Sequence, residues 1–206
     1  MFRMESKTII LIGPEGAGKS TIGALLATSL AKPLYSLDRH RDALYAPYGY
    51  SPAVAQSIYD THGLWAFYAH WTVFEFQAVC HILGNAARQP DEFFGKILDF
   101  GAGHSVYDNP EELAAVEALM APFEHVFLVL PCEDVDEAAR IMEARRGKEL
   151  GLNRHFLTHE SNGRLAKYTI YTKDRAPEEC AEEILQILRR GSQSREGEEA
   201  SLSTVV

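Results

Sequence analysis

Clusters of basic residues are missing from this chain, which has 20 Lys and Arg against 29 Asp and Glu and a net charge of −9 over 206 residues. A nucleic-acid surface or an anionic membrane surface needs concentrated positive charge, so the composition argues against both partners. Apolar runs also stay well short of the ~20 residues that a membrane-spanning helix needs. We therefore expect a globular protein with no nucleic-acid partner and no membrane partner.

Cysteine is scarce, with only Cys80, Cys132 and Cys180. The three positions are far apart and odd in number, so they indicate neither a disulfide framework nor a metal-ligand spacing. Reduced thiols of this kind are typical of a cytoplasmic protein. The short polar segment before the first predicted strand lacks the apolar region of a signal peptide, which also favours a cytoplasmic location.

Short β-branched and apolar segments alternate along the chain with amphipathic ones. We predict strands over residues 7–12, 34–37, 96–100, 125–130 and 167–172. Helices are predicted over residues 21–30, 51–87, from 110 onward, 135–146 and 177–188, with a break at Gly63 and an N-cap at Asn109. Strands that alternate with helices form a parallel sheet that is covered on both faces. The pattern predicts a three-layer α/β fold.

Residues 1–190 are predicted to form one domain, because no linker interrupts them. Residues 147–164 are polar and irregular. Residues 191–206 are rich in Ser, Gly and Glu, a composition typical of a disordered tail. A monomer or a homodimer is expected.

The first predicted strand leads into the pattern G-x-x-x-x-G-K-[ST], matched by Gly13, Gly18, Lys19 and Ser20. Glycines let successive backbone N–H groups turn toward phosphate oxygens, and the following helix adds its positive N-terminal end. In such a loop the lysine reaches the β and γ phosphates and the serine hydroxyl ligates Mg²⁺. The motif predicts ATP and Mg²⁺ as cofactors.

A chance glycine turn is the alternative, but the loop follows an apolar strand and opens a helix, as the motif requires. The residues expected to contact the nucleotide are Gly13, Glu15, Gly16, Ala17, Gly18, Lys19, Ser20 and Thr21.

This opening resembles that of shikimate kinases, from Leu11 to Gly23 and on through Leu34 to Asp38. Further similarity lies in the segment from Ile58 to Gly63. It also includes the glycine run Gly101-Ala102-Gly103 and the stretch from Thr172 to Leu185.

The resemblance implies a five-stranded parallel sheet of the nucleoside-monophosphate-kinase type. It also implies a helical substrate-binding segment, over residues 39–90 here, and a mobile lid, over residues 145–164, that brings arginines to the phosphates. The implied reaction moves the γ-phosphate of ATP to an alcohol. By the same resemblance, the acceptor contacts Asp38, Gly101, Ala102 and Gly103, and we also expect it to contact Tyr68 of the aromatic segment.

Several positions depart from the family pattern. The family has an Asp-x-Asp after its second strand, but this chain has Ser36 in place of the first Asp. Residues 65–71 are Trp-Ala-Phe-Tyr-Ala-His-Trp where the family has an arginine that binds substrate, and no arginine occurs between Arg41 and Arg88. An aromatic pocket without that arginine favours a flatter, less acidic or larger acceptor than shikimate.

Two aspartates are candidate site residues. Asp38 follows the second strand, where it would hold or deprotonate the acceptor hydroxyl; the alternative is an N-cap for the segment that begins at Arg39. Asp99 ends the third strand, where a carboxylate beside a phosphate loop often orients Mg²⁺ through water; the alternative is a turn cap.

Arginines flank the predicted lid, and closure of a lid can deliver positive charge to a transferring phosphoryl group. We expect Arg145 and Arg146 to act in catalysis and Arg154 to contact the nucleotide. The alternative is a solvated helix face with pairs such as Asp136 with Arg140. His155 and His159 are spaced for one face of a helix, but no third metal ligand is apparent, so solvated lid histidines are favoured.

The aromatic residues between positions 65 and 76 either line the acceptor pocket or form the core face of an amphipathic helix. The leading hypothesis for function is a shikimate kinase-like enzyme with an altered small-molecule acceptor. A nucleotide or nucleoside kinase is one alternative, although it would need arginines in the substrate segment. An ATP-binding regulator with little catalysis is the other.

Overall fold

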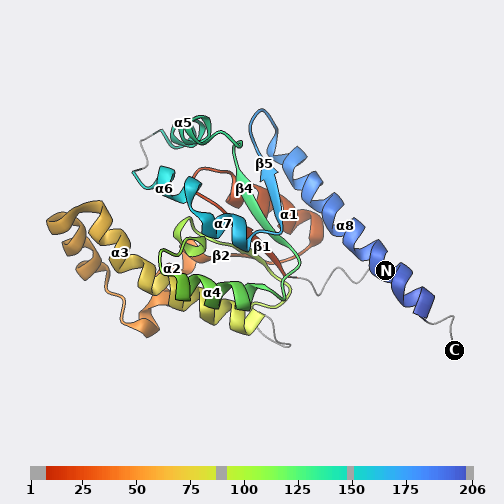
Figure 1. Ribbon diagram of the computed structural model, residues 1–206, viewed down its shortest axis with the longest axis horizontal. Helices are drawn as coiled ribbons and strands as arrows, with labels where there is room; N and C mark the ends of the chain where they lie inside the picture. Colours follow the sequence, from red (N-terminus) through yellow and green to blue (C-terminus); the bar gives the residue numbers. More distant parts are fainter. Residues whose placement is uncertain (1–7, 87–91, 148–150, 203–206) are drawn as a thin grey trace.

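The computed structural model describes residues 8–86, 92–147 and 151–202, with side chains described as far as residue 190. Five parallel strands form one sheet in the order β2-β3-β1-β4-β5, which confirms the predicted α/β fold (Figure 1). The strands are β1 Ile9–Ile12, β2 Leu34–Ser36, β3 Ile97–Asp99, β4 Val126–Leu130 and β5 Tyr168–Tyr171.

Alternate residues of the central strand β1 face two separate cores. Ile10 and Ile12 pack with one cluster and Ile9 and Leu11 with the other, and all four are almost fully buried. A strand buried on both faces is a continuous apolar run, which is the pattern that this segment has.

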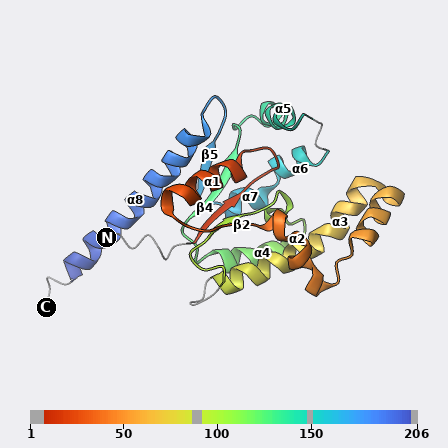
Figure 2. The same cartoon turned by 180° about the vertical axis from the view of Figure 1, so that it is seen from behind.

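One layer of helices packs on each face of the sheet. The first layer contains α1 Lys19–Leu30, α5 Val135–Arg146 and α8 Pro177–Leu202. The second contains α2 Leu37–Tyr45, α3 Pro52–Ala86, α4 Pro110–Met120 and α7 Glu160–Leu165. In Figure 2, α1 lies in front of the sheet beside α8, whereas α3 and α4 run side by side along the other layer.

Several local predictions are confirmed. Gly63 interrupts α3 with φ 79° and ψ −174°, a conformation that only glycine adopts readily. Asn109 caps α4 by accepting a hydrogen bond from the backbone N–H of Glu111. Helix α5 has the predicted bounds.

Other predictions are wrong. Residues 147–164 were expected to be irregular, but α6 Asn153–Thr158 and α7 lie within them, and His159 caps α7 by accepting from the N–H of Ser161. Helices of six residues are too short to show a periodic pattern. Helix α2 was also not predicted.

The last helix was predicted to end at residue 188, but α8 is described to Leu202. Residues 203–206 lie outside the described part of the chain, as do residues 148–150 of the predicted lid. The limits of domain, lid and tail stay predictions.

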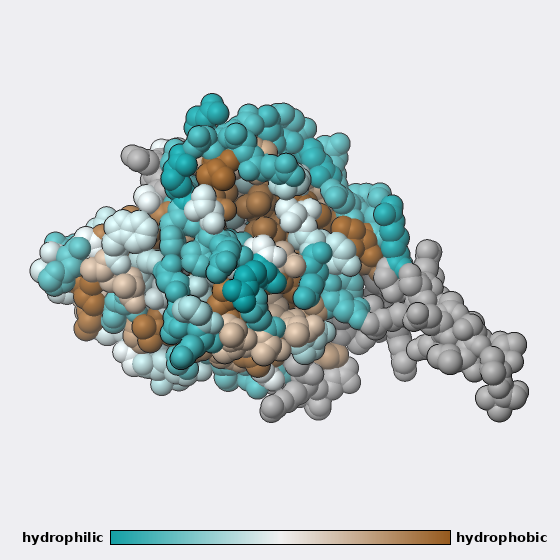
Figure 3. Space-filling view, viewed as in Figure 1, coloured by the Kyte–Doolittle hydropathy of each residue, from teal (hydrophilic) through white to brown (hydrophobic). Residues whose placement is uncertain are grey.

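No helix among the described residues is both long enough and apolar enough to cross a bilayer. The face shown in Figure 3 is mostly hydrophilic, with separate hydrophobic patches between the polar areas.

Candidate active site

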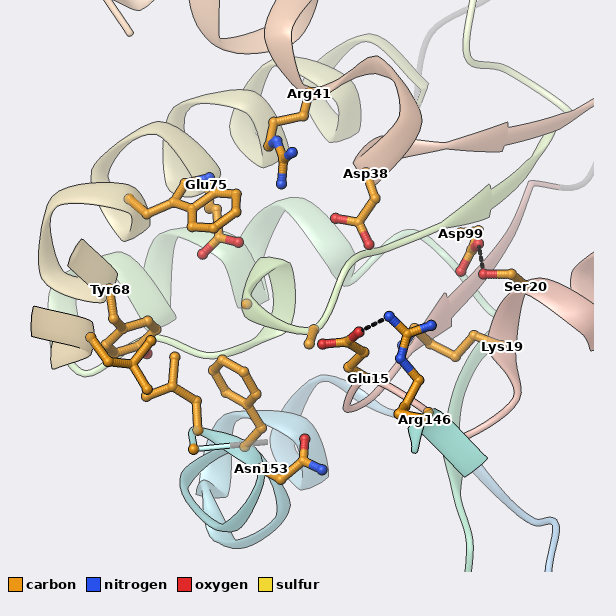
Figure 4. Close-up of a pocket in the computed structure, with 18 of the residues that line it drawn as sticks. Glu15, Lys19, Ser20, Asp38, Arg41, Tyr68, Glu75, Asp99, Arg146 and Asn153 are labelled. Atoms are coloured by element: carbon orange, nitrogen blue, oxygen red, sulfur yellow. Dashed lines mark hydrogen bonds and ion pairs between the residues drawn. The ribbon is translucent and has the colours of Figure 1, made fainter. Parts of the chain in front are cut away.

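A cavity of about 840 Å³ opens at the carboxyl edge of the sheet, where the loop after β1, the start of α2 and the end of β3 meet (Figure 4). Ligands of open parallel sheets bind at this edge. Thirteen of the predicted site residues line it: Glu15, Gly16, Gly18, Lys19, Ser20, Thr21, Asp38, Tyr68, Asp99, Ala102, Gly103, Arg145 and Arg146. Gly13, Ala17, Gly101 and Arg154 do not.

The phosphate loop owes its shape to its glycines. Gly13, Gly16 and Gly18 have φ of 127°, 83° and 112°, and a Cβ on Gly13 would lie 2.5 Å from the carbonyl oxygen of Val129. Helix α1 begins directly after Gly18, and no side chain caps it. An uncapped helix N-terminus presents backbone N–H groups to an anion. The loop geometry therefore fits phosphate.

Lys19 lies across this loop. Its side chain is buried, at 7% exposure, and Nζ donates to the carbonyl oxygens of Gly13 at 2.7 Å and Pro14 at 2.8 Å. Burial lowers the pKa of Lys19, whereas the nearby carboxylates, Asp99 first, raise it. The ammonium is thus held inside the loop by neutral carbonyl groups, which leaves its charge available to a phosphate.

Ser20 and Asp99 form a polar pair beside the phosphate loop. Ser20 Oγ donates to Asp99 Oδ2 at 2.7 Å, and the buried Oδ1 has no hydrogen-bond partner in the described structure. Burial raises the pKa of Asp99, although Lys19 and the Ser20 hydroxyl lower it. A hydroxyl beside an unpartnered carboxylate oxygen is a donor set that suits Mg²⁺. These contacts show that Asp99 is not a turn cap.

Asp38 lies in the first turn of α2, whose N-cap is Ser36, so the alternative that Asp38 caps the helix is wrong. Its carboxylate packs against the bare Cα of Gly101, where an added Cβ would lie 2.1 Å from Oδ1. Gly101 therefore supports Asp38 from behind and does not itself face the cavity.

Glu75 of α3 also lines the cavity, and the sequence analysis did not identify it. Its side chain is only 8% exposed, and its carboxyl packs on Gly103, where a Cβ would lie 2.2 Å from Oε2. Burial and, to a smaller extent, the nearby Asp38 raise the pKa of Glu75 to about 8, although Arg41 opposes the shift. A single acid between Phe74 and Phe76 in an apolar helix was the available signal.

Arg41 of α2 is a second cavity residue that was not predicted from the sequence. Its guanidinium lies 4.5 Å from the ring centroid of Trp71 and points into the cavity between Asp38 and Glu75 (Figure 4). The buried Nε has no hydrogen-bond partner in the described structure. Stacking on an aromatic face holds a guanidinium in place.

Both interpretations of the aromatic segment hold. Tyr68, Phe67 and Trp71 line the cavity, whereas Phe74 packs with Tyr45 in a small buried cluster. The Tyr68 ring lies on the wall, and its hydroxyl contacts Asp108 and His155.

Each of the three predicted arginines contacts a different part of the structure. Arg145 donates to the carbonyl oxygens of Gly16 and Ala17, both at 3.3 Å, and to Thr172 Oγ1 at 3.0 Å, so it anchors the phosphate loop. Arg146 pairs with Glu15 at the rim.

Arg154 pairs with Asp136 of α5 and is 67% exposed, so this conformation does not bring it to the loop. Arg140 was expected to pair with the Asp136 side chain, but its Nε donates to the backbone carbonyl oxygen of Asp136 instead.

His155 and His159 meet a third polar residue that the sequence did not show. Asp108 Oδ1 lies 3.5 Å from His155 Nε2 and 3.2 Å from His159 Nε2, and Tyr68 donates to Asp108 Oδ2 at 3.3 Å. His159 Nδ1 accepts from Ser161, so the proton of the neutral ring lies on Nε2 and points to Asp108. The cluster is therefore a hydrogen-bond network that joins α3 to the α6–α7 segment. Its three ligand atoms also lie within 4.8 Å of one another, a spacing that could hold a metal ion.

No family model matches the chain. A stretch of 36 residues is 50% identical to shikimate kinase of Marinomonas sp. (strain MWYL1) and spans 18% of this chain and 20% of that protein. The structure of shikimate kinase from Acinetobacter baumannii in complex with shikimate is similar over 90% of this chain and 94% of that chain, with a TM-score of 0.62 and 19% identity.

A gluconokinase from Sinorhizobium meliloti 1021 is similar over 95% of this chain and 99% of that chain, with a TM-score of 0.58 and 14% identity. The chain has a shikimate kinase-like P-loop kinase fold. The resemblance stated from the sequence is thereby confirmed for the fold. A shikimate kinase and a gluconokinase thus share this fold.

Proposed function

We propose that the protein is an ATP-dependent phosphotransferase that moves the γ-phosphate to a hydroxyl of a small metabolite. One observation carries the proposal: the phosphate loop and the Asp38 carboxylate line one cavity that also has room for an acceptor. In-line transfer needs donor phosphate and acceptor hydroxyl to be held together in such a space.

The donor half consists of the phosphate loop and its two polar pairs. Backbone N–H groups from Gly16 to Ser20 bind phosphate oxygens, and Lys19 exchanges the loop carbonyls for the β and γ phosphates. Ser20 Oγ and Asp99 would hold Mg²⁺, which supplies positive charge to the phosphates when bound. This assignment is supported by the unpartnered Asp99 oxygen.

In the acceptor half, Asp38 accepts the proton of the hydroxyl that attacks the phosphoryl group. The Asp38 side chain is exposed to the cavity, which suits a carboxylate that must reach a substrate. Lys19 and Arg146 neutralise the negative charge on the transferring group. Arg145 contributes by fixing the loop.

Arg154 remains a proposed nucleotide contact. It would first have to leave Asp136, and an ion pair this exposed is weak, so the exchange is easy. Closure of the α6–α7 segment would then bring the guanidinium toward the phosphates.

The test is ADP formation by the purified protein with ATP and Mg²⁺, with and without a panel of cyclitols, sugars, nucleosides and shikimate. We expect ADP and a phosphorylated product with at least one alcohol, and loss of both in Lys19→Ala. Lys167→Ala, an exposed lysine outside the cavity, is the matched control and should keep full turnover. Normal turnover by Lys19→Ala would overturn the mechanism, and ATP binding without product across the panel would favour the regulator.

A further inference from the structure

Two carboxyl groups in the acceptor half pack against the same short loop, residues 101–103. Asp38 packs on Gly101 and Glu75 packs on Gly103, and any side chain on either glycine would collide with a carboxyl oxygen, at 2.1 Å and 2.2 Å. The two carboxyls come from different helices, α2 and α3, and both line the cavity. The glycines therefore let both acids approach one backbone segment, from which they face the same space (Figure 4).

Among the described residues, neither acid forms an ion pair with Lys or Arg. The basic side chain within 4 Å of the Glu75 carboxyl is that of the buried His104, whose Nδ1 lies 3.9 Å from Oε1. Burial lowers the pKa of His104 to about 4, so this ring is neutral at pH 7. The oxygens of both acids are thus available to hydroxyl groups, and each carboxylate can accept several hydrogen bonds.

The positive charge of this half is limited to Arg41. The other basic side chains that line the cavity are bound to the phosphate loop: Lys19 to its carbonyls, Arg145 to its backbone and Arg146 to Glu15. Arg41 faces two carboxyls, so the acceptor half has no excess positive charge, whether or not Glu75 is ionised. An acceptor carboxylate would find no net attraction here.

The remaining wall is aromatic. Trp71, Tyr68 and Phe67 line the cavity beside the two acids. Aromatic faces pack well against the C–H groups of a ring or chain, while carboxyls and a guanidinium take its hydroxyls. This combination suits a compound with many hydroxyls and no charge.

We infer that Asp38 and Glu75 form a two-carboxyl cradle for neighbouring hydroxyls of an uncharged polyhydroxylated acceptor, and that Glu75 determines the selection against carboxylated ones. The inference rests on the proposed kinase function and narrows its acceptor. Asp38 receives the reacting hydroxyl, and Glu75 binds a second one. Protonated Glu75 both donates and accepts, whereas the ionised form adds a second negative charge beside Asp38.

The first experiment compares polyhydroxylated acceptors that are similar in size and differ in charge. One series is glucose, gluconate and glucosamine, and the other is myo-inositol, quinate and 2-deoxystreptamine. We expect kcat/KM to be at least tenfold higher for the uncharged member of at least one series. A preference for the carboxylate or the amine in both overturns the inference and leaves the kinase function standing. No product from any member of the panel overturns the kinase function, and the inference with it.

The second experiment repeats the comparison of the same acceptors at pH 7 and at pH 9. Glu75 ionises near pH 8, so the wild type should disfavour the carboxylated member more strongly at pH 9. We expect the ratio of kcat/KM for the uncharged member to that for the carboxylated member to rise about tenfold. Where the carboxylated member is not turned over, its inhibition constant should rise by the same factor. Glu75→Gln should remove this rise, whereas Glu178→Gln, an exposed acid on α8, should retain it.

ATP binding by Glu75→Gln verifies that the variant is folded. Discrimination that changes equally with pH in the wild type and in Glu75→Gln overturns the role of Glu75.

Discussion

Asp99 accepts a hydrogen bond from Ser20 at 2.7 Å with one carboxylate oxygen and keeps the other buried without a partner in the described structure. A buried acceptor without a partner is unfavourable, and a bound cation or its water would satisfy it. The pair thus marks a position where a bound cation would satisfy the unpartnered Asp99 oxygen.

Asp99→Asn should reduce the stabilisation of the folded protein by Mg²⁺. We expect Mg²⁺ to raise the melting temperature of the wild type in the presence of ATP, and to raise that of Asp99→Asn much less. Activity of the variant should fall at least tenfold and recover partly at high Mg²⁺. Differential scanning calorimetry with and without Mg²⁺ measures the first effect. An equal Mg²⁺ shift in both proteins would rule out the metal role.

Glu75 should make the protein less stable as the pH rises. The folded state raises the pKa of Glu75 from 4.5 to about 8, so it keeps a proton that the unfolded chain releases between these values. The contribution of Glu75 to the free energy of unfolding is therefore fully present below pH 4.5 and is lost as the pH rises to 8. The difference is on the order of 3–5 kcal/mol.

Urea unfolding of the wild type and Glu75→Gln at pH 5 and pH 8.5 tests this. His104, whose pKa is lowered, acts in the opposite direction below pH 6.5, and its Nδ1 lies 3.9 Å from the Glu75 carboxyl, so the difference between the two proteins reports the Glu75–His104 pair and not Glu75 alone. A wild type and variant with the same pH dependence would contradict the buried state of Glu75.

Gly101→Ala should impair catalysis while ATP binding persists. The new Cβ would lie 2.1 Å from Asp38 Oδ1 and push the carboxylate from its position, so we expect kcat to fall at least 100-fold. Gly84→Ala is the matched control, because a Cβ there meets nothing within 4 Å and the helix should gain roughly 0.5–1 kcal/mol. Isothermal titration with ATP and steady-state kinetics separate the two effects. Unchanged kcat in Gly101→Ala would show that the packing of Asp38 on Gly101 does not control turnover.

Asp108→Ala should loosen the α6–α7 segment. The Asp108 carboxylate accepts from Tyr68 and His159, which belong to elements far apart in the sequence. We expect amide hydrogen exchange of residues 151–165 to accelerate roughly 5- to 10-fold, with β4 unaffected. Asp136→Ala, which removes the exposed pair with Arg154, should have a smaller effect on the same segment. Equal effects of the two variants would mean that the cluster does not hold the segment.

Local sequence signals predicted the elements that depend on local physics. The alternation of apolar segments predicted the sheet, Gly63 the break in α3, and Asn109 the start of α4. The phosphate loop was equally clear, because its glycines, lysine and serine are consecutive.

What the sequence did not reveal depends on contacts between distant segments. Arg41 and Glu75 are 34 positions apart and become neighbours only when α2 packs on α3. Asp108 joins two histidines of another segment in the same way. Arg154 was predicted at the phosphates from its charge and its place in the predicted lid, and nothing local indicated that Asp136 would be its partner.

The two halves of the cavity belong to different cores. Ala17 of the phosphate loop packs with Ile22, Met142 and Ile170 on one face of the sheet, whereas Tyr45 and Phe74 support the acceptor wall from a separate cluster. Substitutions in the acceptor wall can therefore accumulate without loosening the nucleotide half. Under the proposed function, a chain built in this way can exchange one acceptor for another over evolutionary time while its nucleotide half stays intact.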